Sequence, residues 1–173
     1  VYEIDELESW RDGKEVLSTY KIDGVSCSLI YENSRLVIGK TRGDGSYGED
    51  ITAKVRWISD VAGSLKEKNI NAEVRGEIYC TEENFFILSN EMEKLGLEKP
   101  TSQRNIVAGL VGRKDHVELS RYLSFQAFEW ISDDLPVKTE MEKLRLMKRE
   151  GFSVPDGIVH KNIRTIEQVI NDA

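Results

Sequence analysis

Apolar residues recur along the chain at two different spacings, and the spacing separates predicted strands from predicted helices. Val25, Cys27, Leu29 and Tyr31 alternate with polar positions, which is the pattern of a half-buried strand. Similar short runs bounded by turn residues predict further strands over 16–20, 36–41, 72–80 and 122–130. The polar residues 32–35 predict a hairpin turn between the second and third strands.

Helical spacing is clearest after Thr81, a capping residue followed by an apolar stripe of Phe85, Leu88 and Met92 and by a stop at Gly96. Two capping boxes, Thr139 with Glu142 and Thr165 with Gln168, open further predicted helices, the first of which ends at Gly151 and the second of which lies at the C-terminus. We also expect helices over 51–58 and 105–111. Helices inserted between strands of a mostly antiparallel sheet make an α+β fold.

The length of 173 residues fits one well-buried domain. The chain starts in helix-like sequence and stops within a predicted helix, so we expect a fragment of a longer protein. A hydrophobic content of 39% with 32% charged residues is typical of a globular chain. There is no apolar run of about 20 residues and no secretory leader, so we expect no membrane partner. The two cysteines lie in strand-like runs and predict reduced thiols in a cytoplasmic protein.

The net charge of −7 argues mildly against a protein that only binds nucleic acid, since phosphate contacts need basic surface. Basic residues nevertheless outnumber acidic ones over 99–115, four to one, and over 138–149, five to two. Two interpretations explain this pattern: a local basic surface that binds a partner, or helix faces whose charges are simply solvated. No Cys or His cluster has the spacing of metal ligands, and His116 and His160 are expected at the surface.

Lys21, in the tetrapeptide Lys21-Ile22-Asp23-Gly24, is the residue with the most chemical potential. It lies between two apolar runs, and burial lowers the pKa of a lysine amine and frees it as a nucleophile. Such an amine attacks a carbonyl carbon or a phosphorus. The alternative is a surface lysine in a turn, with its apolar stem packed and its amine in water.

Two further blocks combine glycine with charge. The segment 42–52 contains Arg42, three glycines and several acids, a composition that suits either a cradle for ribose or phosphate or a long loop with turn glycines. Its spacing is neither that of a Walker A loop nor that of a Rossmann turn. Glu77 ends a strand next to Gly76 and could accept hydrogen bonds from ribose hydroxyls, hold a metal, or be a charge at the rim.

Three other side chains are candidates for ligand contact. Arg104 and Arg113 flank an apolar helical segment and could meet phosphate or simply end a solvated helix. Phe128 lies on a predicted strand, where a ring either stacks on a base or packs in the core.

Taken in order, these blocks resemble the adenylation (nucleotidyltransferase) domain of bacterial-type NAD-dependent DNA ligases. The resemblance rests on Lys21-Ile22-Asp23-Gly24, on Thr41-Arg42-Gly43-Asp44-Gly45 with Gly48-Glu49-Asp50-Ile51-Thr52, on Val74-Arg75-Gly76-Glu77, and on Arg104-Asn105 with Ala108-Gly109. The long glycine-rich loop is its most specific part. It implies an ATP-grasp-like nucleotidyltransferase core, with residues 1–173 forming one partial adenylation domain.

The resemblance also implies a mechanism. Lys21 would attack the α-phosphorus of NAD, expel nicotinamide mononucleotide and hold AMP, which passes to the 5′-phosphate of nicked duplex DNA before sealing. Asp23 would help shape the catalytic site. Thr19, Ile22, Arg42, Glu77 and Phe128 would contact the nucleotide, with Glu77 on the ribose and Phe128 in place of a tyrosine that stacks on adenine. Arg104 and Arg113 would contact DNA phosphates, magnesium would offset phosphate charge, and a monomer is expected.

Several positions depart from the family pattern. Thr19 stands where a glutamate usually grips the adenine amino group, Ser102-Gln103 replaces an asparagine-proline pair, and Arg113 comes one residue later than usual. The segment 156–161 looks like a later lysine motif, but its context leads us to interpret it as coincidental. Two other functions share the lysine chemistry or the sequence: an ATP-dependent polynucleotide ligase or capping-type nucleotidyltransferase, and a non-catalytic nucleotide-binding or nucleic-acid-binding module.

Overall fold

The computed structural model describes residues 4–42, 48–162, 164, 166 and 168. Its contacts divide the chain into two compact units. The first unit combines residues 1–21 with residues 155–173, and the second comprises residues 22–154.

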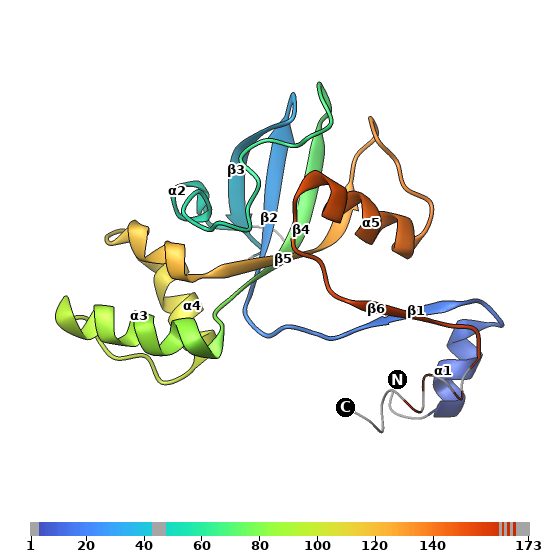
Figure 1. The fold of residues 1–173 in the computed structure, drawn as a ribbon, viewed down its shortest axis with the longest axis horizontal. Helices are drawn as coiled ribbons and strands as arrows, with labels where there is room; N and C mark the ends of the chain where they lie inside the picture. Colours follow the sequence, from blue (N-terminus) through green and yellow to red (C-terminus); the bar gives the residue numbers. More distant parts are fainter. Residues whose placement is uncertain (1–3, 43–47, 163, 165, 167, 169–173) are drawn as a thin grey trace. The chain divides into compact units, whose positions relative to one another are not determined.

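The second unit is built on a four-stranded sheet with the order β3-β2-β4-β5 (Figure 1). Its strands are β2 (Val25–Glu32), β3 (Arg35–Thr41), β4 (Ala72–Tyr79) and β5 (Ser124–Ile131). Every neighbouring pair is antiparallel. Helices separate β3 from β4 and β4 from β5 along the chain, which confirms the predicted α+β class.

One face of this sheet forms the core of the unit. The strand residues buried there are Cys27, Leu29, Tyr31, Val74, Ile78, Phe125, Ala127 and Trp130. They alternate along each strand except in β5, where a bulge at Phe128 places Ala127 and Trp130 on the same face. Phe152 follows α5 and meets the rings of both Tyr31 and Phe125 edge-on, with centroids 6.0 and 6.2 Å away. Gly76 is needed on this face because a Cβ there would lie 2.3 Å from the Phe125 ring. The period of two read from the sequence is thus a division between a buried and an open face.

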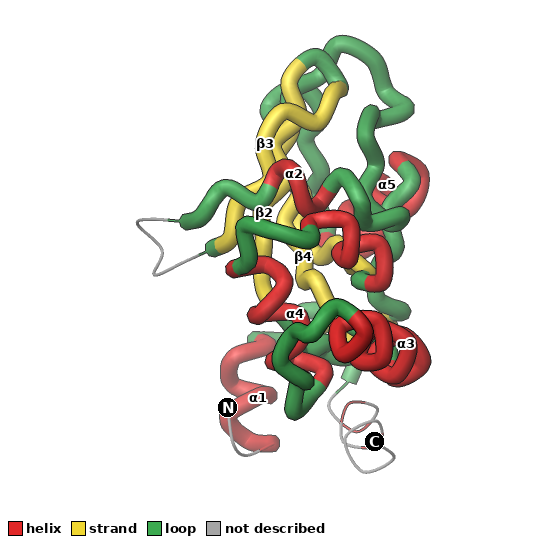
Figure 2. Tube along the Cα trace, turned by 90° about the vertical axis from the view of Figure 1, so that its left-hand side faces the viewer, coloured by secondary structure: helices red, strands yellow, loops and turns green. Residues whose placement is uncertain are grey.

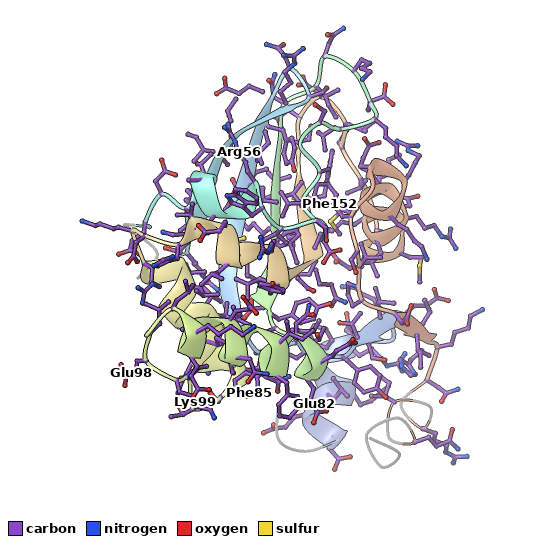
Figure 3. The ribbon with its side chains drawn as sticks, turned by 60° about the vertical axis from the view of Figure 1, so that its left-hand side comes forward. Arg56, Glu82, Phe85, Glu98, Lys99 and Phe152 are labelled. Carbon is purple, nitrogen blue, oxygen red and sulfur yellow. The ribbon has the colours of Figure 1, made fainter. Side chains whose placement is uncertain are left out.

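The helices of the second unit contact the sheet at its edges and its end. α2 (Thr52–Val55) contacts β3, α5 (Glu140–Glu150) contacts β5, and α4 (Gln103–Gly112) contacts β2 and β4. α3 (Glu82–Lys94) lies beside α4 in both views (Figures 1 and 2), and a 3-10 helix, Val117–Tyr122, precedes β5. Figure 3 shows Glu98 and Lys99 on the segment that joins α3 to α4, and Phe152 beyond the end of α5.

Side-chain caps open three of these helices, and two of them, Thr81 and Thr139, were predicted. Thr81 accepts a hydrogen bond from the Asn84 N–H, Ser102 from the Asn105 N–H and Thr139 from the Glu142 N–H. Gly151 ends α5 with a φ of +105°, a backbone conformation that glycine adopts without strain. The helix boundaries at 81, 139 and 151 therefore follow from side-chain capping, as the sequence predicted.

The first unit contains α1 (Ile4–Arg11) and a two-stranded antiparallel sheet of β1 (Val16–Thr19) and β6 (Gly157–His160). The Arg11 guanidinium pairs with Glu8 at 2.6 Å and donates to the carbonyls of Lys14 and Lys161. Within the segment 156–161, Gly157–His160 form strand β6, and Arg164 further along the chain is helical. No helix in the described part of the chain has the length and apolar character needed to cross a membrane.

Three expectations need correction or fall outside the structure. The helix expected over 51–58 is only α2, because beyond Val55 the chain continues in turns such as Trp57 N–H to Lys54 carbonyl and Ile58 N–H to Val55 carbonyl. His160 was expected at the surface but is buried, with its Nε2 2.7 Å from the Ser18 hydroxyl. The capping residue Thr165 lies outside the described residues.

Candidate functional site: a carboxylate clamp and an open polar sheet face

Glu77 fixes the segment that follows Lys21. Its Oε1 accepts a hydrogen bond from the Gly24 N–H at 3.0 Å, and its Oε2 accepts one from the Ser26 hydroxyl at 2.6 Å. The contact follows from strand register, since Ser26 on β2 lies directly opposite Glu77 on β4. The sheet therefore brings together two sequence blocks that lie about fifty residues apart.

Gly24 cannot be replaced without moving the backbone. A Cβ at this position would lie 2.0 Å from the carbonyl oxygen of Ile78. The glycine of the tetrapeptide is thus explained by the close approach of the chain to β4, which also allows its N–H to reach Glu77.

Asp23 and Arg104, two residues expected in the site, lie together. The Arg104 Nη1 is 3.3 Å from the Asp23 Oδ1, and both side chains are about two-thirds exposed at 66% and 65%. Arg104 is in the first turn of α4, which Ser102 caps. Because both charges remain in water, this ion pair contributes little to stability and leaves both groups accessible to a ligand.

A cavity of about 420 Å³ opens on the sheet face opposite the core. Arg42 and Phe128, both expected to contact the nucleotide, line it. Phe128 is 43% exposed, so its ring is available for stacking. Lys40, Arg75, Glu73 and Glu129 supply charges, and the remaining wall is formed by Ser26, Cys27, Ser28, Thr41 and Gly48. Glu77 is not among the lining residues, but its partner Ser26 is.

The base of the glycine-rich loop is closed by its own polar residues. Thr41 Oγ1 accepts from the Glu49 N–H at 2.9 Å, and the Thr41 N–H donates to the Glu49 carbonyl. A Cβ at Gly48 would lie 2.0 Å from the Thr41 carbonyl oxygen. Asp50 accepts from both the N–H and the hydroxyl of Thr52. These residues therefore shape the loop, whereas residues 43–47 lie outside the described part.

Arg113 does not line the 420 Å³ cavity. It ends α4, the helix whose first turn holds Arg104, and its guanidinium pairs with Asp115 at 2.9 Å. A helix of 10 residues is about 15 Å long, so the two arginines lie at opposite ends of α4. Arg113 lines a second cavity, of about 280 Å³, together with Lys99, Thr101 and Asn105.

Lys21 and Thr19 belong to the first unit, and Ile22 begins the second. The Lys21 side chain is exposed, so the burial that we expected for its amine is not seen. Thr19 is also exposed and pairs with Gly157 at the end of β1. Ile22 is half-buried.

Ion pairs and a hydrogen bond hold the charged side chains of the open face. Arg75 Nε lies 2.7 Å from Glu73, Ser28 donates to the same carboxylate, and Lys143 Nζ lies 2.6 Å from Glu129. Burial opposes the charge of Glu73, but the hydrogen bonds from Arg75 and Ser28 outweigh it and hold the pKa of this carboxyl below its usual value. Burial likewise opposes the charge of Lys143, and its carboxylate partners outweigh it and raise its pKa.

Six polar or charged residues that line this cavity were not among the predicted site residues: Ser26, Ser28, Lys40, Glu73, Arg75 and Glu129. A signal for two of them was present, since Ser26 and Ser28 are the polar positions of the alternating strand. Assigning them to the site requires the pairing of β2 with β4, which periodicity alone does not give. Among the described residues no group of three or more His, Cys, Asp or Glu side chains is arranged to hold a metal ion.

The chain also matches a known protein family. The family model for the NAD-dependent DNA ligase adenylation domain matches residues 2–173. The chain is 43% identical over 143 residues to a DNA ligase of Afipia carboxidovorans and 41% identical over 143 residues to one of Nitrobacter hamburgensis. Both matches cover 80% of this chain, which spans about a fifth of the length of these relatives (20%). The chain therefore belongs to the family of adenylation domains of NAD-dependent DNA ligases.

Proposed function

We propose that this chain carries out the adenylation step of an NAD-dependent DNA ligase, with Lys21 as the nucleophile. The Lys21 Nζ, once it has lost its proton, attacks the α-phosphorus of NAD. A phosphorus–nitrogen bond forms as the bond between phosphorus and the bridging oxygen breaks, and nicotinamide mononucleotide leaves with that oxygen. AMP stays on the lysine and is then transferred to the 5′-phosphate of a nick.

The observation that carries the proposal is the double hydrogen bond of Glu77 to Gly24 and Ser26. It fixes the residues that directly follow Lys21 next to a carboxylate on a rigid strand. An ionised carboxylate has about four acceptor positions, so two remain for the hydroxyls of a ribose. Preorganised groups of this kind position a substrate before the chemical step.

The cavity supplies the other contacts that a nucleotide needs. Phe128 offers an exposed ring on which adenine stacks, and Arg42 offers a cation to the phosphates. Ile22 would pack against the nucleotide, and Thr19 would take the place of the usual glutamate near the adenine. A threonine hydroxyl makes a weaker contact than a carboxylate, so we expect adenine to be held mainly by stacking.

Nicked duplex DNA is the proposed second substrate. Arg104 can exchange its exposed partner Asp23 for a DNA phosphate, because the exposed pair is weak. Arg113 and Lys99 at the second cavity would contact phosphate further along the strand. Binding should weaken steeply with salt, as phosphate contacts release counterions. We propose that the protein acts as a monomer in the cytoplasm, a location that suits its two free cysteines.

Magnesium is proposed as an ion that arrives with the substrate. It usually keeps several waters and binds one or two carboxylates together with substrate phosphates. The exposed carboxylate of Asp23 is available for such a contact. When bound, the ion would offset phosphate charge.

Intact-mass measurement of the full-length polypeptide that carries this chain tests the proposal. The protein is incubated with magnesium and NAD, ATP or GTP in parallel. We expect a mass gain of one AMP with NAD only, and none in Lys21→Ala or in the charge-conserving control Lys21→Arg. A mass gain with ATP or GTP instead would favour an ATP-dependent ligase or a capping-type nucleotidyltransferase. No mass gain with any nucleotide would favour the non-catalytic module.

A further inference from the structure

We infer that Ser26 is a positioning residue that orients the Glu77 carboxylate and thereby sets the selectivity of the site for a ligand with ribose hydroxyls. This inference rests on the proposed function, because it concerns the same nucleotide site. Neither the resemblance nor the sequence pattern assigns Ser26 a role.

The hydroxyl of Ser26 is one of two groups that hold the carboxylate. It donates to Oε2 at 2.6 Å, while the Gly24 N–H donates to Oε1 at 3.0 Å. A carboxylate with a donor on each oxygen cannot turn about its last side-chain torsion, which is otherwise broad. Loss of the Ser26 hydroxyl leaves a single donor, and the plane of the carboxylate is then free to rotate.

The backbone of Ser26 is held independently of its hydroxyl. Its carbonyl accepts a hydrogen bond from the Arg42 N–H at 3.1 Å, and its strand pairs with β4 on the other side. Removal of the hydroxyl oxygen should therefore leave strand β2 and Arg42 in place. The substitution isolates the contact with Glu77.

Ser26 also connects Glu77 to the space that a ligand enters. Ser26 lines the 420 Å³ cavity, and Glu77 does not. A ribose bound at the side of the cavity that Ser26 lines would reach the carboxylate next to the Ser26 hydroxyl. The two free acceptor positions are then presented in one fixed direction, which favours a ligand with two neighbouring hydroxyls over one with a single hydroxyl.

Ser28 provides a matched control. It lies two residues further along the same strand, on the same face, and lines the same cavity. Its hydroxyl also donates to a carboxylate, but to Glu73 instead of Glu77. Ser28→Ala therefore removes an equivalent hydroxyl without changing the contacts of Glu77.

The test compares kcat/KM of lysyl-AMP formation for NAD and for NAD analogues that lack the 2′- or the 3′-hydroxyl of the adenosine ribose, in the full-length polypeptide that carries this chain. For Ser26→Ala we expect kcat/KM for NAD to fall about tenfold, as for loss of a hydrogen bond to a charged group. For the analogue that lacks the hydroxyl contacted by Glu77, we expect kcat/KM to change less than about twofold. The preference of the enzyme for NAD over this analogue should therefore be lost. Ser26→Thr should restore it, and Ser28→Ala should keep it.

The outcomes separate this inference from the proposed function. Equal losses for NAD and both analogues in Ser26→Ala, or equal effects of Ser26→Ala and Ser28→Ala, would overturn the positioning role while adenylation itself stands. An additional loss when Ser26→Ala is combined with Glu77→Gln would also overturn it, since two residues that act through one contact are not additive. Failure of the wild-type protein to form lysyl-AMP overturns the proposed function, and this inference with it.

Discussion

The two faces of the four-stranded sheet are formed by alternate residues of the same strands, yet they are covered and charged very differently. On one face Leu29, Val74 and Phe125 are fully buried. On the other, Ser28, Arg75 and Glu129 line an open cavity. One set of side chains thus forms the core, and the other forms the face on which the cavity opens.

The difference between the two faces explains how the polar side chains of the open face can be held rigidly. Side chains on the open face are oriented by each other, as Glu77 is by Ser26 and Glu73 is by Ser28 and Arg75. The strands beneath them are immobilised by packing on the opposite face. Rigid elements under preorganised side chains are what a site for covalent chemistry requires.

Removal of one aromatic ring from each face of β5 should have the largest effect and tests the division into a buried and an open face. Phe125 is 0% exposed and contacts Phe152, whereas Phe128 is 43% exposed. Phe125→Ala should lower the free energy of unfolding by about 3–5 kcal/mol, because it leaves a cavity in the core. Phe128→Ala should change it by less than about 0.5 kcal/mol. Urea titrations of both variants measure the difference, and equal losses would show that the faces are not divided in this way.

A buried carboxylate at the end of α5 should have the next largest effect. Glu150 is 1% exposed, and its Oε2 accepts hydrogen bonds from the N–H groups of Lys66 and Glu67. Glu150→Ala leaves these donors unpaired and should lower the free energy of unfolding by about 1–3 kcal/mol. Glu67→Ala is the control, since it keeps the N–H and removes only an exposed side chain. A neutral effect of Glu150→Ala would mean that water replaces the carboxylate.

On the open face the same kind of substitution should affect binding instead of stability. Phe128→Ala removes the ring on which adenine is proposed to stack, so we expect the binding free energy of NAD to weaken by about 1–2 kcal/mol. Phe128→Tyr keeps the ring and should bind as the wild type does. Calorimetric titration with NAD in the Lys21→Ala background, which prevents turnover, measures the change. Unchanged affinity in Phe128→Ala would place the base elsewhere.

The smallest expected effect is a pH dependence of stability from Glu73. Its pKa is lower in the folded protein than the ordinary value of about 4.3. Such a group stabilises the fold above that ordinary value, and the contribution is lost as pH falls through the lower folded-state pKa. Glu73→Gln should therefore flatten the decline in stability below about pH 5, by no more than about 1 kcal/mol. Thermal melts at pH 3–7 report this, with the exposed Glu83→Gln as a control that should keep the wild-type slope.

Local signals predicted most of the fold. Alternation gave β2 and β4 to within one residue, and the capping residues Thr81 and Thr139 gave the starts of α3 and α5. The shortness of α2 was not predictable, because the residues after Val55 have helical periodicity but are held in turns. His160 was misplaced because its burial depends on the pairing of β6 with β1, strands that lie about 140 residues apart.

Several residues of the candidate site could be predicted from the sequence, but the contacts between them could not. Motif order pointed to Asp23, Arg104 and Glu77, and the structure brings Asp23 to Arg104. Motif order did not reveal that Glu77 binds Gly24 and Ser26, since this contact depends on the register between β2 and β4. The apolar runs on either side of Lys21 suggested a buried amine, but its side chain is exposed, as in the alternative of a surface lysine. Long-range pairing is the information that a local pattern lacks.

The proposed function requires that the amine of Lys21 becomes bonded to AMP. Peptide mapping by mass spectrometry, after incubation with NAD and tryptic digestion without acidification, locates the modification. We expect AMP on the peptide 15–35, in which trypsin fails to cut after Lys21 because the modified amine carries no charge. AMP on Lys161 or on any other lysine, with Lys21 cleaved and unmodified, would contradict the account.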